Sequence, residues 1–412
     1  MDNVRKIRKD KGLYFILDHR RSEGFSNEKI AVFVNLYYLD MVEYCLKYLE
    51  RLDQRIDIYI ASSNLEVLEK THCIVEQHGA RNIRLWEKDN RGRDVSALLV
   101  TFRNIAMKYE FFCFIHDKKE KRVQQKADID LWVRNLWGNT LESQCYVDNV
   151  MDIFAKNPQV GLLVPPEPIG ADIHTWYINT WFSNFEPTVT LADKLNLDCE
   201  ISCENAPITI GTVFWTRSLA LKKLLETEWR YEDFPPEPMP VDGTLGHAVE
   251  RVLAYVAQDA GYDTGTIMTA PYAEKQLAMA QEHMYKTYRI LDRHWGVGSL
   301  RDLRRMDANY NLLSNFCSDH SPILLYGAGL IAKSVRSALG LMGFAVWGIV
   351  VTEKQIVPEE ICGLPIMEID DLVYEEGMGI IISVNSDYRG QVIDELEKRG
   401  IKEYLALDWQ CV

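Results

Sequence analysis

A run of five consecutive apolar residues at 111–115 constrains the fold more than any other feature of the sequence. The run is too short for a buried helix and is typical of a strand covered on both faces, as in a parallel sheet. Four polar residues follow it directly: His116, Asp117, Lys118 and Lys119. Ligands of open α/β sheets bind beyond the carboxyl ends of the strands, where carboxylate and imidazole can hold a divalent cation and lysines can contact phosphate. The alternative is that these charges only end the strand.

The segments around this run alternate between strand and helix patterns. Three are short and apolar, as strands are: residues 31–36, 56–60 and 82–86. Three others carry apolar side chains at helical spacing: residues 41–52, 65–78 and 95–105. Such alternation predicts an α/β fold, with helices flanking a mostly parallel sheet. Because βαβ crossovers are right-handed, the loops after the strands should lie on one edge of this sheet.

The rest of the chain predicts three parts. Further strands and helices are expected before residue 275: residues 129–155, 160–164, 208–215, 218–229 and 245–256. Residues 276–319 have the pattern of a helical linker. Beyond Pro322 a new pattern of strands and helices begins, which indicates a small α/β unit. We therefore expect domains at 1–275 and 320–412, joined by the linker 276–319.

Composition excludes some classes of protein. A length of 412 residues suits two or three domains, and the net charge of −14 argues against nucleic acid as a partner. No apolar run approaches the about 18 residues of a spanning helix, and no signal-peptide core is evident at the start. Nine scattered cysteines are typical of reduced thiols in the cytoplasm. The basic segment 5–11 could contact anionic lipid, or be only a solvated terminus.

A polar turn follows the third expected strand and precedes a helix. It contains Asn90, Arg91, Arg93 and Asp94 around a single glycine. Asp94 could cap the helix through its carboxylate, which is a structural role. Two guanidinium groups at a helix amino end would instead suit a diphosphate, assisted by backbone N–H groups. The pattern therefore predicts donor-phosphate binding by this turn together with residues 116–119.

Asp242 follows a loop of four prolines and precedes another helix. It could be only a helix cap, but a rigid loop also suits a general base, which must lie within reach of its proton. Glu250, eight residues later, could share the same face or pair with Arg251. The aromatic segment 174–185 is either a small satellite core or a sugar-stacking surface. The candidate acceptor-binding residues are Trp176, Trp181 and His247.

Residues 30–275 resemble the rhamnan synthesis F family of bacterial polysaccharide glycosyltransferases. The resemblance rests on five motifs in the family's order: residues 90–94, 116–119, 161–165, 211–215 and 242–251. It implies a GT-A-like nucleotide-binding sheet. The implied reaction is an inverting transfer of a sugar, often rhamnose, from a nucleoside-diphosphate donor to a growing surface glycan. In that reaction the catalytic candidates are Asp242, as the base, and Glu250.

The resemblance also implies cofactors and partners. Relatives usually carry an Asp-x-Asp metal motif where this chain has residues 116–118. Asp117 and His116 could still hold Mg²⁺ or Mn²⁺, but Lys118 could replace part of the cation's charge. We expect dTDP-rhamnose as donor and a glycan or lipid-linked acceptor. The expected location is the cytoplasm, with peripheral contact to the inner membrane surface.

The carboxyl-terminal unit contains a glycine pattern of its own. Gly327 and Gly329 have the spacing of a dinucleotide fingerprint between a strand and a helix, and Glu353 is the only acidic candidate for a ribose. We interpret this unit as a small Rossmann-like nucleotide-binding or docking module and expect no redox cofactor. Two rival functions remain: an oxidoreductase or epimerase that uses this unit, and a non-catalytic scaffold.

Overall fold

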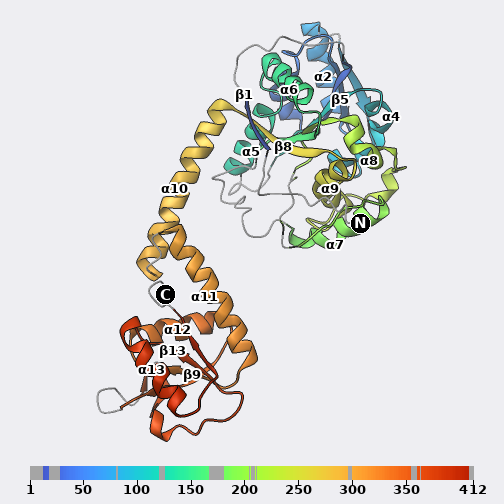
Figure 1. The fold of residues 1–412 in the computed structure, drawn as a ribbon. Helices are drawn as coiled ribbons and strands as arrows, with labels where there is room; N and C mark the ends of the chain where they lie inside the picture. The colour runs from blue at the N-terminus through green and yellow to red at the C-terminus, as the bar shows by residue number, and fades with distance from the viewer. Residues whose placement is uncertain are drawn as a thin grey trace. The chain divides into compact units, whose positions relative to one another are not determined.

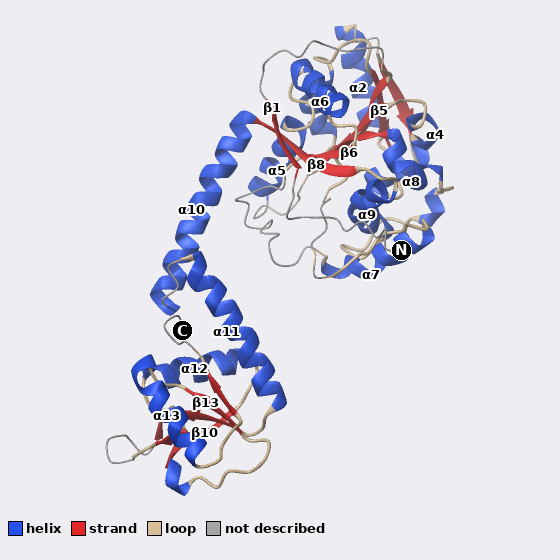
Figure 2. Cartoon of the chain, viewed as in Figure 1, coloured by secondary structure: helices blue, strands red, loops and turns tan. Residues whose placement is uncertain are grey.

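The computed structural model describes residues 13–17, 28–79, 82–119, 126–166, 181–203, 205, 209, 211–295, 299–353, 360–361 and 363–407. The chain forms two compact units, unit 1 at Met1–Met279 and unit 2 at Ala280–Val412. Figures 1 and 2 show strands and helices interleaved in both units. Each unit is described by itself.

Unit 1 is built on an eight-stranded sheet with the order β1-β8-β6-β7-β5-β2-β3-β4. Its strands are β1 (Leu13–Leu17), β2 (Ile30–Asn35), β3 (Asp57–Ser62), β4 (Ile83–Glu87), β5 (Phe111–His116), β6 (Val160–Val164), β7 (Phe214–Arg217) and β8 (Asp263–Thr269). Only β7 runs antiparallel to its neighbours β5 and β6. The expected α/β fold with a mostly parallel sheet and flanking helices is therefore confirmed.

Helices cover both faces of this sheet. The first face carries α1 (Val42–Leu49), α2 (Leu65–His78), α5 (Lys126–Gly138) and α6 (Gln144–Lys156). The second carries α3 (Arg93–Ser96), α4 (Arg103–Ala106), α7 (Phe185–Lys194), α8 (Lys222–Glu226) and α9 (Leu245–Asp259). Alternate residues of β5 enter opposite cores, Cys113 the first and Phe114 the second. A strand buried on both faces explains why residues 111–115 are apolar without alternation.

Short helical turns connect these elements. They are η2 (Leu39–Met41), the π-helical Ala97–Thr101 between α3 and α4, η5 (Phe182–Asn184), η6 (Ser218–Leu221) and η7 (Tyr231–Asp233). The expected helix 129–155 is two helices, because Ser143 begins α6 by accepting a hydrogen bond from the Tyr146 N–H at 3.2 Å. The strand expected at 208–215 begins only at Phe214.

Unit 2 holds a six-stranded sheet with the order β11-β12-β10-β9-β13-β14. Its elements are β9 (Ile323–Tyr326), α12 (Leu330–Leu341), β10 (Val346–Val351), β11 (Glu360–Ile361), β12 (Leu364–Glu368), η9 (Ile369–Asp371), β13 (Gly379–Ile382), α13 (Ser386–Lys398) and β14 (Tyr404–Ala406). All pairs are parallel except β11 with β12.

The expected linker 276–319 falls in two helices, α10 (Ala270–Trp295) and α11 (Leu300–Asp319). Helix α10 contains the boundary between the units, and α11 contributes Leu313 and Cys317 to the core of unit 2. In the part of the chain that the structure describes, no helix has the length and apolar character needed to cross a membrane.

Candidate active site

The carboxyl ends of β2 and β5 meet at Asp117. The Asp117 N–H donates to the Asn35 carbonyl at 3.1 Å, which continues the ladder between the two strands. Its carboxylate Oδ2 accepts the N–H groups of Tyr37 and Tyr38 at 2.9 and 2.7 Å. Burial raises the pKa of Asp117 to about 6, although these two hydrogen bonds oppose the shift. Asp117 is therefore committed in part to holding the loop after β2.

His116 joins Asp117 to the turn after β4. Its Nδ1 donates to the Asp117 carbonyl at 2.8 Å, and its Nε2 lies 3.8 Å from Asp94 Oδ2. With Nδ1 as the donor, a neutral ring would turn a lone pair toward the carboxylate. The pair therefore attracts only when the imidazole is protonated or when another cation lies between the two groups.

Asp94 is not the helix cap that the sequence suggested. Gly92 occupies the N-cap position of α3 and provides no side chain, whereas Asp94 lies within the first turn. Burial alone would raise the pKa of Asp94, but the nearby His116, a hydrogen bond from Thr212 and the charge of Lys118 lower it below its usual value. Asp94 is thus an ionised carboxylate beside two basic side chains.

The turn at 90–94 depends on Gly92. Its φ is +70°, and a Cβ at this position would lie 2.5 Å from Phe234 Cγ. Arg91 Nε donates to the Phe234 carbonyl at 2.6 Å, and its Nη2 donates to the Glu232 carbonyl at 3.1 Å. Glycine is therefore needed both for the left-handed conformation and for the close approach of the loop at 232–234.

The other basic residues of the two motifs are also engaged. Arg93 Nε lies 3.2 Å from Glu237 Oε1, and the Lys118 ammonium lies 3.6 Å from the centre of the Trp132 ring. Lys119 forms an ion pair with Asp40. Asn90 Oδ1 accepts a hydrogen bond from the Ser63 hydroxyl at 3.2 Å. The two arginines of the turn do not converge on one point, since Arg91 holds a loop and Arg93 is half-exposed beside a carboxylate.

The metal site expected from the sequence has a different environment in the structure. His116 faces Asp94, whereas the Asp117 carboxylate accepts hydrogen bonds from the loop after β2. Within the described ranges, no three histidine, cysteine or acidic side chains are grouped as metal ligands. Metal binding by His116 and Asp117 stays a prediction, and Asp94 is the further oxygen ligand that the geometry would offer.

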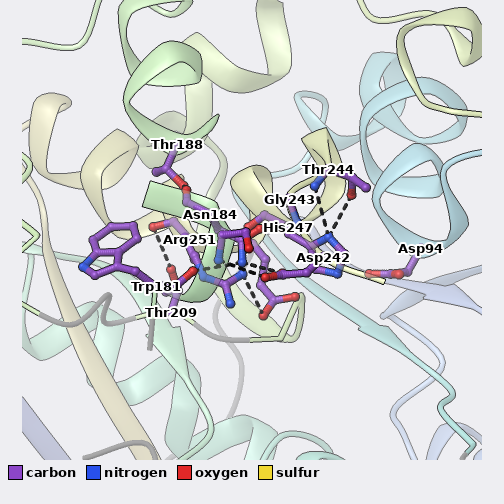
Figure 3. A network of polar contacts seen from close by, with 12 residues as sticks. Asp94, Trp181, Asn184, Thr188, Thr209, Asp242, Gly243, Thr244, His247 and Arg251 are labelled. Atoms are coloured by element: carbon purple, nitrogen blue, oxygen red, sulfur yellow. Dashed lines mark hydrogen bonds and ion pairs between the residues drawn. The ribbon is translucent and has the colours of Figure 1, made fainter. Parts of the chain in front are cut away.

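Asp242 lies in a second polar network, between the starts of η5 and α9 (Figure 3). Its Oδ2 accepts the Ser183 N–H at 3.0 Å, and its Oδ1 accepts the Asn184 side-chain amide at 2.6 Å. Asn184 is fully buried and also accepts the Gly243 N–H at 3.0 Å. Burial raises the pKa of Asp242, but the hydrogen bonds outweigh this effect and lower it below its usual value. Asp242 is therefore a fixed, ionised carboxylate.

The first turn of α9 supplies the neighbours of Asp242. His247 Nδ1 lies 2.8 Å from the Thr244 hydroxyl and accepts the Thr244 N–H at 3.4 Å. Burial lowers the pKa of His247, so its ring is neutral at pH 7. Glu250 lies 3.8 Å from the buried Arg251, which is the pairing that the sequence offered as an alternative role. Figure 3 shows Asp242, Thr244 and His247 close together, with Asp94 beside them.

Direct packing joins the two networks. Helix α3 contacts α9, and a Cβ on Gly246 would lie 3.8 Å from Val95 Cγ2. The hydrogen bonds of Arg91 and the ion pair of Arg93 reach the proline loop that leads to Asp242. The structure therefore brings the two motifs on either side of β5 together with Asp242, as expected for one site built from distant parts of the chain.

The remaining candidates have other surroundings than the sequence suggested or are not described. Trp181 is buried, and its Nε1 donates to the Asn205 carbonyl at 2.7 Å, so its ring belongs to a packed core. Trp176 lies outside the described residues. In unit 2, a Cβ on Gly327 would lie 2.7 Å from Val384 Cγ1, so that glycine permits the packing of two strand ends. Gly329 is the N-cap of α12, and Glu353 is exposed after β10.

Sequence reasoning missed two residues of the site. Lys88, directly after β4, is 6% exposed, and Asn184 is fully buried beside Asp242. Nothing in the polar segment 87–90 distinguishes the lysine that is buried from the charged residues that are solvated. Asn184 owes its burial to contacts with residues about 60 positions away, Asp242 and Gly243.

The sequence has recognisable relatives. The family model for Rhamnan synthesis protein F matches residues 2–262. Two relatives from strains of Xanthomonas campestris pv. campestris, both described as uncharacterized protein WxcX, are 26% and 25% identical over 239 residues. The match covers 58% of this chain but only 32% of each relative, so the chain spans about a third of their length.

Among solved structures, the chain is similar to the mannosyltransferase PcManGT from Pyrobaculum calidifontis in complex with GDP-Man and Mn²⁺. The two are 14% identical, with a TM-score of 0.35, and the match covers 58% of this chain and 55% of the other. The family model, by contrast, spans well over half of the chain and includes both polar networks. The chain belongs to the Rhamnan synthesis protein F family.

Proposed function

We propose that the protein is a glycosyltransferase of polysaccharide synthesis, which moves a sugar from a nucleoside-diphosphate donor to a growing glycan. The observation that carries this proposal is the meeting of two polar networks at one edge of the unit 1 sheet. One contains His116, Asp117 and Asp94, and the other contains Asp242. Membership of the Rhamnan synthesis protein F family supports the same reaction class.

The first network suits the donor. Departure of a nucleoside diphosphate builds negative charge, which positive groups already in place can stabilise. Lys118, Lys119 and Arg93 supply such groups next to the end of β5 and the turn after β4. If Mg²⁺ or Mn²⁺ takes part, His116 and Asp117 are the residues expected to hold it, and the ion would add charge stabilisation of the leaving diphosphate.

The second network suits the acceptor. In a direct, inverting displacement the acceptor hydroxyl loses its proton on the side of the sugar opposite the diphosphate, which requires a base away from the phosphates. We assign this role to Asp242, with Glu250 as the second candidate. The hydrogen bonds from Ser183 and Asn184 support the assignment, because they fix the carboxylate and keep it ionised. His247, neutral at pH 7, can contact an acceptor hydroxyl.

We infer rhamnose as the sugar, because the family is described by rhamnan synthesis. The donor we expect for this sugar is dTDP-rhamnose. The acceptor would be a glycan, free or linked to lipid. Contact with a lipid-linked acceptor would be peripheral and would take place at the cytoplasmic face of the inner membrane.

A ligand panel tests this function. The full chain is mixed separately with UDP, GDP, dTDP, dTDP-rhamnose and NAD, and its thermal stability is measured. Binding of one nucleoside diphosphate and its sugar should raise the melting temperature, by mass action on the folded state. Release of the free diphosphate in the presence of acceptor glycan then checks transfer. Stabilisation by NAD alone would refute the transferase and favour the oxidoreductase.

A further inference from the structure

Lys88 follows β4 at the same edge of the sheet as the donor candidates. Its N–H donates to the Ser62 carbonyl at 3.0 Å, which fixes the backbone at the end of β3. The side chain is directed inward, so the residue is only 6% exposed. Lysine is rarely buried to this degree unless it is paired, because transfer of an ammonium from water is costly.

The pairing of this ammonium is incomplete. Nζ donates to the Asp89 carbonyl at 2.7 Å and lies 5.9 Å from the centre of the Tyr231 ring. An ammonium has three donors, and in the described part of the chain only this one carbonyl accepts from it. Its acidic neighbours have other cations: Glu237 binds Arg93 at 3.2 Å, and Asp94 faces His116 at 3.8 Å.

We propose that Lys88 is a donor-binding residue, whose ammonium contacts an anionic oxygen of the nucleoside diphosphate. The inference rests on the proposed function and adds a residue that neither β5 nor the turn at 90–94 supplies. A phosphate oxygen would give the ammonium the charged partner that none of the described residues provides. A purely structural lysine would instead be expected to form an ion pair with Asp89, Asp94 or Glu237.

The charge on Lys88 depends on pH in an accessible range. Burial lowers its pKa from 10.5 to about 8, while Asp94, Asp89 and Glu237, from the turn and the proline loop, oppose the shift. Tyr231 is the remaining titratable group that faces it, and burial raises the pKa of that phenol. Above pH 8 the lysine therefore loses its proton, and an interaction with phosphate should weaken.

The test measures binding of UDP, GDP, dTDP and inorganic pyrophosphate to the full chain by calorimetry, from pH 7.0 to 9.5. Affinity of the wild type should fall as pH rises above about 8, by up to about tenfold per pH unit. K88M should bind about 10- to 100-fold more weakly at pH 7, as expected for loss of a charged hydrogen bond. Its affinity should then change with pH only as the probe itself titrates.

Two further variants complete the test. K88R keeps a charge that does not titrate, so its affinity should follow the titration of the probe alone and lack the decrease above about pH 8. K222M removes an exposed lysine of α8 and should behave as the wild type. A flat profile for the wild type, or equal affinities of the wild type and folded K88M, would overturn the role of Lys88 alone. No binding of any probe by the wild type would overturn the proposed function and this inference with it.

Discussion

Replacement of Lys88 by methionine should stabilise the protein at pH 7. Burial lowers the pKa of Lys88 from 10.5 to about 8, so the charged form costs about 3 kcal/mol in the folded state at neutral pH. The variant loses the hydrogen bond to the Asp89 carbonyl, worth about 1 kcal/mol. Methionine has a similar length and needs no partner. The free energy of unfolding should therefore rise by about 2 kcal/mol.

The sign of the pH dependence follows from linkage. Between about pH 8 and 10.5 the unfolded chain binds a proton at Lys88 that the folded chain does not, so the wild type gains stability as pH rises. The advantage of K88M should therefore shrink to about zero by pH 9.5. The wild type and K88M share every other titrating group, so the difference between their free energies of unfolding reports on Lys88 alone.

Urea unfolding at pH 7.0 and 9.5 measures the effect through tryptophan fluorescence, which the buried Trp137 and Trp215 report from unit 1. K222M replaces an exposed lysine of α8, so its free energy of unfolding should stay within about 0.5 kcal/mol of the wild-type value at both pH values. A K88M protein that is less stable than the wild type at pH 7 would refute the reasoning. It would mean that the buried ammonium has a structural partner that offsets its desolvation.

Three further results are expected. G92A should lower the free energy of unfolding by about 2 kcal/mol or more, because the new methyl group clashes with Phe234 and alanine is strained in the left-handed conformation. G79A has the same backbone conformation but open space around it, so it should lower the free energy of unfolding by only about 1 kcal/mol. D242N should lower turnover about 100-fold or more with donor affinity retained, and near-normal turnover would remove Asp242 as the base. More of the protein should float with anionic vesicles than with zwitterionic ones. Charge reversal of Arg289 and Arg293, which are exposed on α10, should lower the fraction that floats with anionic vesicles. Equal flotation with both kinds of vesicle would exclude an electrostatic membrane-binding surface on α10.

The sheet could be predicted where burial leaves a local pattern. Residues 111–115 are apolar because both faces of β5 are covered, and the following polar residues lie at the predicted edge. Strand β8 was missed, since Asp263–Thr269 is mostly polar or small and has only two consecutive apolar residues, Ile267 and Met268. It is nevertheless paired with β1 and β6 on its two sides.

The roles of single charged residues were harder to predict, because they depend on contacts far along the chain. Arg91 was expected at a phosphate, and two of its five N–H donors are bound by carbonyls of residues more than 140 positions away. The cap expected from Asp94 failed because the turn needs glycine at the N-cap, which leaves Asp94 facing His116. The sequence predicts which chemical groups the site contains. Which of them can contact a ligand depends on the tertiary packing.

The proposed function requires an acidic protein to bind an anionic donor. The net charge of −14 repels a nucleoside diphosphate at long range, but salt screens that repulsion over about 10 Å. Most cations near the site already form ion pairs, Arg93 with Glu237 and Lys119 with Asp40. They can bind the donor only if these ion pairs break. Among the described residues Lys88 has no ion-pair partner to give up, and its burial protects it from screening. An unmatched buried cation therefore provides attraction that ordinary salt concentrations leave largely intact.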